Sequence, residues 1–198
     1  MTKQSKKENI RNLIILGDLY DDLHIPLSEK ILCNILKRTF QPIANQVEKI
    51  IYIISTASHD PIIQKEVIKC SLAYKEKTLD ILVSSVPLVI KINNFTALLT
   101  HGEIAISNGA IAYLLNKIME QSGNPLYIER LLKKKLNLNK NVWLIMGHTH
   151  IPGISYTARV ANTGNWKKIW FTNKIPYWRT PSFTYILVKE NNISLKRI

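Results

Sequence analysis

Residues 12–18 read NLIILGD, a short apolar run that ends at Gly17 and Asp18. A run of this length is typical of a buried strand, and the glycine marks the turn that follows it. Similar apolar runs end just ahead of His101 and His148. In open α/β sheets the carboxyl ends of the strands meet loops at one edge, where ligands bind. This stretch therefore predicts an α/β fold with Asp18 at a functional edge.

The rest of the chain alternates short apolar runs, polar turns and helical patterns, which indicates an α/β layer architecture. Helices are predicted for residues 28–40, with Ser28 as the N-cap, and for residues 61–77, 104–119 and 126–136. Strands are predicted for residues 12–16, 49–54, 87–92, 96–100, 142–146, 182–189 and 193–198. We expect Asn93 and Asn94 to form a hairpin turn, because asparagine tolerates left-handed backbone.

The composition fits one domain that spans residues 1–198, with residues 1–11 as a basic extension, since 46% of the residues are hydrophobic and 21% are charged. No apolar run has the length of a membrane span or a signal peptide, so we expect a cytoplasmic protein without membrane contact. Cys33 and Cys70 lie in helix-like stretches without metal or redox spacing. They are expected to be buried small hydrophobic residues and not a disulfide.

The charge balance favours anionic partners. The chain has 27 Lys and Arg residues against 14 Asp and Glu residues, a net charge of +13. Such a surface attracts phosphate esters or nucleic acid, although a solvated surface without a partner has the same composition. Basic residues cluster at positions 133–135 and at Lys167 and Lys168, which lie between Trp166 and Trp170. Aromatic rings beside basic side chains suit stacked bases and phosphate.

Histidines near strand ends predict a metal site. Four of the five histidines, namely His59, His101, His148 and His150, follow the ends of apolar runs. Each one alone is more often a structural residue. Together with Asp18 they form a set of imidazole and carboxylate ligands that suits Zn, Mn or Fe.

Short motifs in this order resemble those of the calcineurin-like metallophosphoesterases. The matching segments are Gly17-Asp18-Leu19-Tyr20-Asp21, Ser58-His59-Asp60, His101-Gly102, Gly147-His148-Thr149-His150 and Asn162-Thr163-Gly164-Asn165-Trp166. They are similar to the family's GDxxD, GNHD, HG, GHxH and Asn-x-Gly-x-Trp segments, and they cover the chain from about residue 12 to its end. The resemblance implies the family's αββα sandwich, with its first strand lost or altered.

The resemblance also implies roles for single residues. Asp18 would bridge two divalent metals (Mn, Zn or Fe), His101 and His148 would bind one of them, and His150 would bind the other. His59 would act on the substrate, and Asp60 would orient the His59 ring. Asp21 would contact the metal ligands and would not itself bind the metal. The implied activity is hydrolysis of a phosphomonoester, phosphodiester or nucleotide by a metal-activated water.

Two departures from the family pattern leave alternatives open. The family's first motif, Asp-x-His, has no counterpart in residues 1–11, and Ser58 stands where the family has a metal-binding asparagine. One metal site is therefore expected, and a second is expected to be weak. The alternatives are a catalytically degenerate binding or scaffolding module, possibly one for nucleic acid, and a chain whose natural start lies upstream of Met1.

Overall fold

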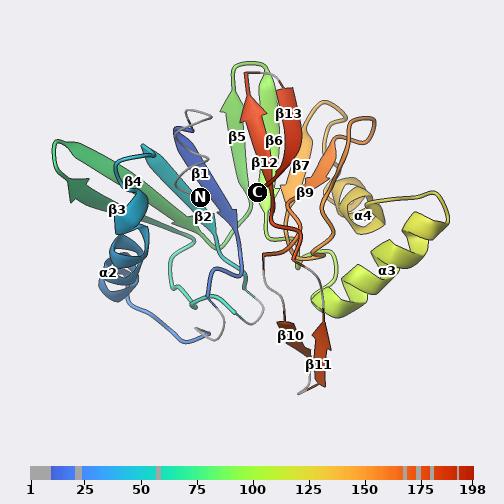
Figure 1. Ribbon diagram of the computed structural model, residues 1–198, viewed down its shortest axis with the longest axis horizontal. Coiled ribbons are helices and arrows are strands. Elements are labelled where there is room, and N and C mark those ends of the chain that lie inside the picture. Colours follow the sequence, from blue (N-terminus) through green and yellow to red (C-terminus); the bar gives the residue numbers. More distant parts are fainter. Residues whose placement is uncertain are drawn as a thin grey trace. The chain divides into compact units, whose positions relative to one another are not determined.

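The protein has a mixed α/β fold (Figure 1), as the sequence predicts. The computed structural model describes residues 10–20, 24–56, 59–166, 169–172, 175–178, 181–190 and 192–198. The chain divides into two compact units, Met1–Leu88 and Val89–Ile198. Within the described residues, no helix is both long enough and apolar enough to cross a membrane.

The first unit contains a four-stranded sheet in the order β1-β2-β4-β3. The strands are β1 (Asn12–Leu16), β2 (Lys49–Ile53), β3 (Val67–Tyr74) and β4 (Lys77–Ser84). β1, β2 and β4 are parallel, and β3 runs antiparallel to β4. β2 is buried at four of its five positions, in agreement with the continuous apolar run of a parallel strand.

Helix α2 (Glu29–Phe40) packs its apolar stripe against this sheet. The Ser28 hydroxyl caps it by accepting the Ile31 N–H, which confirms the predicted cap. Leu32 and Leu36 are fully buried, because their spacing of four residues places them on one face. A short 3₁₀ helix, η1 (Gln41–Ile43), follows.

The helix predicted for residues 61–77 is wrong, because this segment contains β3 and the start of β4. Burial alternates along the first half of β3, where Ile68 and Cys70 are buried between exposed neighbours. This period of two belongs to a strand with one face on the core. Pro61 suggested a helix start, but the branched residues and the alternation outweigh it. Lys75, with φ of 54°, lies in the turn that leads into β4.

The prediction that the cysteines are unpaired is also wrong. Cys33 in α2 and Cys70 in β3 form a disulfide, with their Cα atoms 5.5 Å apart. Both residues point into the space between the helix and the sheet, which brings thiols 37 positions apart in the sequence into bonding distance. Spacing along the chain holds no information about this contact, because the strand that carries Cys70 was expected to be a helix.

The second unit contains a five-stranded sheet in the order β5-β6-β7-β9-β8. Its strands are β5 (Leu88–Ile92), β6 (Phe95–Thr100), β7 (Trp143–Met146), β8 (Gly153–Ser155) and β9 (Val160–Asn162). β6, β7 and β9 are parallel, and β8 is antiparallel to β9. The predicted hairpin between β5 and β6 is confirmed, and Asn93 takes the left-handed conformation with φ of 51°.

Two helices of the second unit precede β7 in the chain. Helix α3 (Gly109–Gln121) begins five residues later than predicted, because Asn108 caps it by accepting the N–H groups of Ala110 and Ile111. Helix α4 (Tyr127–Lys135) agrees with the predicted segment and contacts β7 and β9. The remaining strands form the hairpins β10 (Ile169–Thr172) with β11 (Ile175–Trp178), and β12 (Thr184–Lys189) with β13 (Asn192–Arg197).

Candidate functional site

The parallel strands of the first unit end at a common edge, where Asp18 and Asp60 lie. Leu16 at the end of β1 pairs with Ile53 at the end of β2, which in turn pairs with Ser84 at the end of β4. Asp18 follows β1 in left-handed backbone, with φ of 53°. The sequence argument from aligned carboxyl ends is therefore confirmed within this unit.

Asp60 joins the loops after β1 and β2. Its carboxylate is fully buried and accepts the N–H groups of Asp18 and Leu19 at 2.8 and 3.1 Å. It also accepts the N–H of Ser55 at 2.7 Å and the hydroxyl of Tyr52. These bonds hold the backbone of Asp18, since they fix the N–H of a residue in an unfavourable conformation.

Burial dominates the electrostatics of this cluster. It raises the pKa of Asp60, and the nearby Asp18 carboxylate raises this pKa further, while the bonds from Tyr52 and Ser55 oppose the shift. Burial also raises the pKa of the Tyr52 hydroxyl, and the Asp60 carboxylate adds to that rise. A tyrosine that stays protonated is a permanent donor to Asp60.

One predicted site residue lies beside this cluster. His59 lies half-buried in the bend directly before Asp60. The orientation of the His59 ring by Asp60 stays a prediction. His24 lies on the same side of the unit, because its Nδ1 is 3.2 Å from the carbonyl oxygen of Asp60. Asp21 and Ser58 fall outside the described residues.

The parallel strands of the second unit also end at a common edge. Thr100 at the end of β6 pairs with Met146 at the end of β7, which pairs with Asn162 at the end of β9. His101 and His148 follow β6 and β7 directly or after one residue, and both are buried. Gly102 follows His101 with φ of +115°, and a Cβ at this position would collide with Cε of Met146 and lie 3.3 Å from Cβ of His148.

The structure brings His101 and His148 together. Nδ1 of His148 lies 3.1 Å from Nε2 of His101, and the two ring centroids are 5.0 Å apart. Nε2 of His148 lies 2.6 Å from the carbonyl oxygen of Ile106. Because a carbonyl only accepts, Nε2 carries a proton, and in the neutral ring Nδ1 then has a lone pair that faces His101. Glu103 adds a carboxylate oxygen 3.6 Å from the same His101 nitrogen.

This pair fits one divalent metal. Two imidazole nitrogens that share a zinc-sized ion at about 2.0–2.1 Å lie roughly 3.0–3.4 Å apart. A ring N–H given to a backbone carbonyl is also the usual support of a metal-binding histidine. Among the described residues, no group of three or more His, Cys, Asp and Glu side chains is arranged to hold a metal. Asp18 belongs to the first unit and the two histidines to the second, so the complete ligand set stays a prediction.

The loop after β7 holds two histidines in left-handed backbone. His148 has φ of 50° and His150 has φ of 60°. Each such residue costs about 1–2 kcal/mol relative to ordinary backbone. Conformations of this kind cluster at functional sites and persist only where surrounding contacts hold them.

Sequence reasoning missed the residues that support the histidines and Asp18. Tyr52 lies in an apolar strand, where its hydroxyl gave no signal. Glu129 is fully buried and bonds to Thr149, between the two histidines. One signal was available, because Glu129 shares the apolar face of α4 with Ile128 and Leu132 at helical spacing. A carboxylate on that face indicates a buried polar contact.

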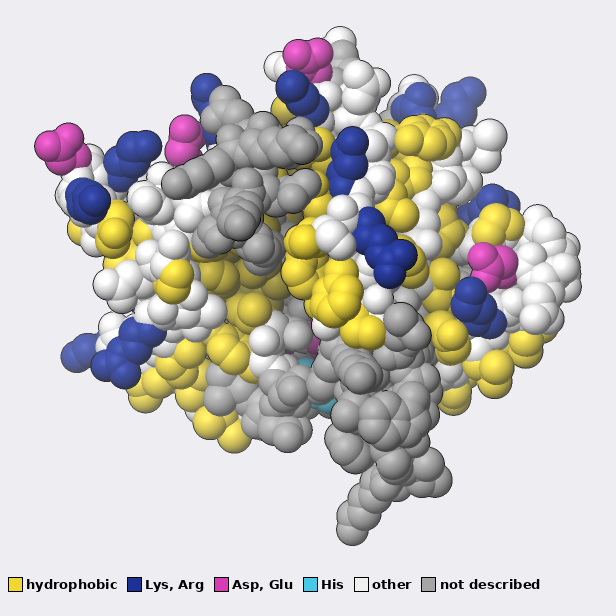
Figure 2. Space-filling view, viewed as in Figure 1, with side chains coloured by type: hydrophobic (Ala, Val, Ile, Leu, Met, Phe, Trp, Pro, Cys, Tyr) yellow, Lys and Arg dark blue, Asp and Glu magenta, His cyan; other side chains and the backbone are white. Residues whose placement is uncertain are grey.

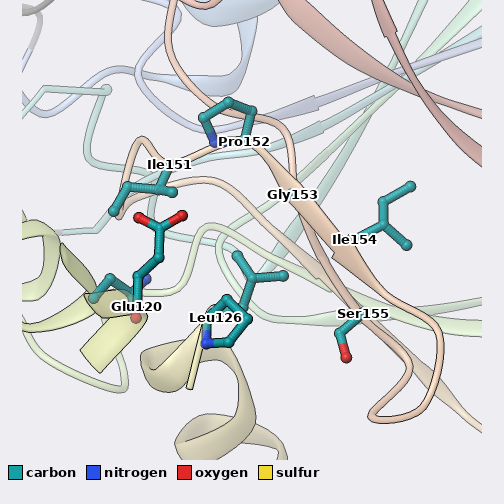
Figure 3. A pocket seen from close by; sticks show the side chains of 9 residues that line it. Glu120, Leu126, Ile151, Pro152, Gly153, Ile154 and Ser155 are labelled. Carbon is teal, nitrogen blue, oxygen red and sulfur yellow. The ribbon is translucent and has the colours of Figure 1, made fainter. Parts of the chain in front are cut away.

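A cavity of about 210 Å³ lies beside this loop in the second unit (Figure 3). Leu126, Ile151 and Ile154 contribute apolar side chains to its wall, and Glu120 and Ser155 contribute polar ones. Ile151 directly follows His150 in the sequence. The cavity was not expected from the sequence.

The structure changes the interpretation of the basic residues. Lys133 was expected on a basic surface, but its side chain is buried and donates to the carbonyls of Val142 and Ala158 at 2.6 and 2.8 Å. Lys134 and Lys135 remain exposed. Lys167 and Lys168 fall outside the described residues. On the face seen in Figure 2, Lys and Arg side chains are scattered over the described surface.

Comparisons with known proteins show similarity to solved structures only. No protein-family model and no curated protein matches the chain. Among solved structures, the chain is similar to a single-residue variant of Vps29 from Entamoeba histolytica, with 15% sequence identity and a TM-score of 0.42. The similarity covers 94% of this chain and 97% of that chain. Values this low carry no argument about activity.

Proposed function

We propose that this chain is a metal-dependent phosphoesterase whose metal is held by Asp18, His101 and His148. The observation that carries the proposal is the state of the His148 ring. One of its nitrogens donates to a backbone carbonyl at 2.6 Å, and the other lies 3.1 Å from His101. A ring fixed in this way presents a lone pair for a metal. His150 and the shared Asp18, with Ser58 as a poorer neutral ligand, would form a weaker second site.

Hydrolysis forms a bond between phosphorus and a water oxygen, breaks the ester bond, and delivers a proton to the leaving oxygen. A bound divalent ion supplies Lewis-acid polarisation of the phosphoryl oxygens and a lowered pKa for water. His59 is proposed to donate the proton to the leaving oxygen. The role of Asp60 is to hold the Asp18 backbone, through the N–H that its carboxylate accepts.

The second candidate is a binding module that retains the fold without turnover. The serine at position 58 favours it, because serine stands where the family has an asparagine ligand of the second metal. The net charge of +13 suits a polyanion such as nucleic acid, or a phosphorylated small molecule, as its partner.

Metal titration of the full chain tests the proposal. Calorimetry with Mn²⁺ should give one tight event, which His101→Ala abolishes and His150→Ala leaves nearly unchanged, because only His101 belongs to the better site. Hydrolysis of bis(p-nitrophenyl) phosphate should stop with EDTA and fall about a hundredfold or more in His59→Ala, at unchanged Mn²⁺ affinity. Hydrolysis that survives EDTA refutes the metal mechanism. Metal binding without any hydrolysis favours the binding module.

A further inference from the structure

Four polar side chains lie fully inside the second unit, directly behind the histidine loop. They are Asn116 of α3, Glu129 of α4, Thr149 of the loop and Asn162 of β9, and none is more than 1% exposed. Buried polar groups weaken a fold unless every one is bonded, and an apolar cluster of the same size would be at least as stable. The cluster is therefore expected to have a role beyond stability.

Glu129 is the common acceptor of the cluster. Its Oε1 accepts the Thr149 hydroxyl at 2.7 Å and the Asn162 amide at 2.8 Å. Its Oε2 accepts the Asn116 amide at 2.9 Å. The Oδ1 atom of Asn116 accepts the N–H of Ile128 at 2.8 Å, which anchors the start of α4.

The same bonds reach both sides of the histidine loop. Thr149 stands between His148 and His150, both of which have left-handed backbone. The Asn162 amide also donates to the carbonyl of Gly147, just ahead of His148. Its Oδ1 accepts the N–H of Gly164 at 2.8 Å, so Asn162 is itself fixed. The backbone on each side of His148 is thus held by partners of one carboxylate.

We infer that Glu129 is a positioning residue, which holds His148 and His150 in the backbone conformation that directs their rings to the proposed metal sites. The value of this role for metal binding rests on the proposed function, whereas the control of the loop conformation does not. The opposing interpretation is that the cluster only stabilises the core. A purely structural role would leave the ring environments unchanged in any variant that still folds.

A reversal of one hydrogen bond separates the two interpretations. In Glu129→Gln, the new amide places an NH₂ group against an NH₂ group of Asn116 or Asn162, whichever way it lies. The double variant Glu129→Gln/Asn116→Asp restores a donor opposite an acceptor, because the introduced carboxylate at position 116 accepts from the glutamine. The carboxylate at position 116 can also still accept the Ile128 N–H, as the Asn116 oxygen does. Volume is nearly constant throughout.

The primary measurement is nuclear magnetic resonance of the imidazole nitrogens in the metal-free full chain. Glu129→Gln should shift the His148 and His150 signals, and the double variant should return them toward the parent positions. The His59 signal, from the first unit, is the internal control and should stay in place. By calorimetry, Glu129→Gln should weaken Mn²⁺ binding at least tenfold, and the double variant should recover to within about threefold of the parent.

Unshifted His148 and His150 signals in a folded Glu129→Gln variant overturn the inference, as does a double variant that folds without recovery. If Glu129→Gln does not fold, Thr149→Val is the deciding variant, because it removes the hydroxyl that donates to Glu129 and accepts from the amides of Asn116 and Asn162. Unshifted signals in Thr149→Val then overturn the inference. A parent chain that fails to bind Mn²⁺ refutes the proposed function alone, since the imidazole signals still report loop position.

Discussion

At the residue scale, the buried pair of Tyr52 and Asp60 should make the fold less stable at alkaline pH. Burial and the Asp60 carboxylate raise the pKa of Tyr52. The folded chain therefore keeps the Tyr52 hydroxyl proton at about pH 10, where a free tyrosine ionises. The unfolded chain loses it, and the free energy of unfolding therefore falls as pH rises above about 10. Urea unfolding across this range should show a shallower decline in Tyr52→Phe than in the parent. Tyr74→Phe, at the partly buried end of β3, is the matched control and should follow the parent. Equal slopes in all three proteins would contradict the assignment.

At the element scale, the disulfide between α2 and β3 should be a main support of the first unit. It closes a loop with a sequence separation of 37, which by chain entropy corresponds to about 4 kcal/mol. Reduction should lower the free energy of unfolding by about 2–4 kcal/mol. The matched control is Cys33→Ala/Cys70→Ala, whose unfolding should not respond to reductant. Alkylation of both cysteines in the native, unreduced chain would show that the bond is absent in solution.

The same elements show how far the sequence determines the fold. Helix α2 and the parallel strands β1, β2, β6 and β7 could be predicted, because Ser28 and the apolar runs carry local signals that agree with their packing. β3 could not be predicted with the signals used, since Pro61 and a mixed apolar pattern competed with the alternation around Cys70. At the candidate site, the motif residues were predicted from their resemblance to the family's motifs. The contacts of Tyr52 and Glu129 were not predicted, because they depend on which residues the fold brings opposite these two side chains.

At the scale of the whole molecule, the net charge of +13 should produce salt-dependent contact with single-stranded nucleic acid. Binding should weaken steeply as salt rises, because counterions leave the phosphates when lysines replace them. Lys134→Ala/Lys135→Ala should reduce the slope of log affinity against log salt by roughly 0.7 per lost contact. Lys30→Ala, which removes an exposed lysine of α2, is the control variant. Affinity that is indifferent to salt, or no binding at low salt, would remove nucleic acid as a partner.

The burial of Lys133 has a consequence for chemical footprinting. Burial lowers its pKa, which by itself would make the amine more reactive toward an acylating reagent. Access outweighs this effect, because Nζ is enclosed and donates to the carbonyls of Val142 and Ala158. Brief acetylation of the native chain should therefore modify Lys134 and spare Lys133, its neighbour in the sequence. Mass spectrometry of the peptide that contains both lysines would then compare the acetylation of Lys133 with that of Lys134. The ratio would report whether α4 is packed against its sheet.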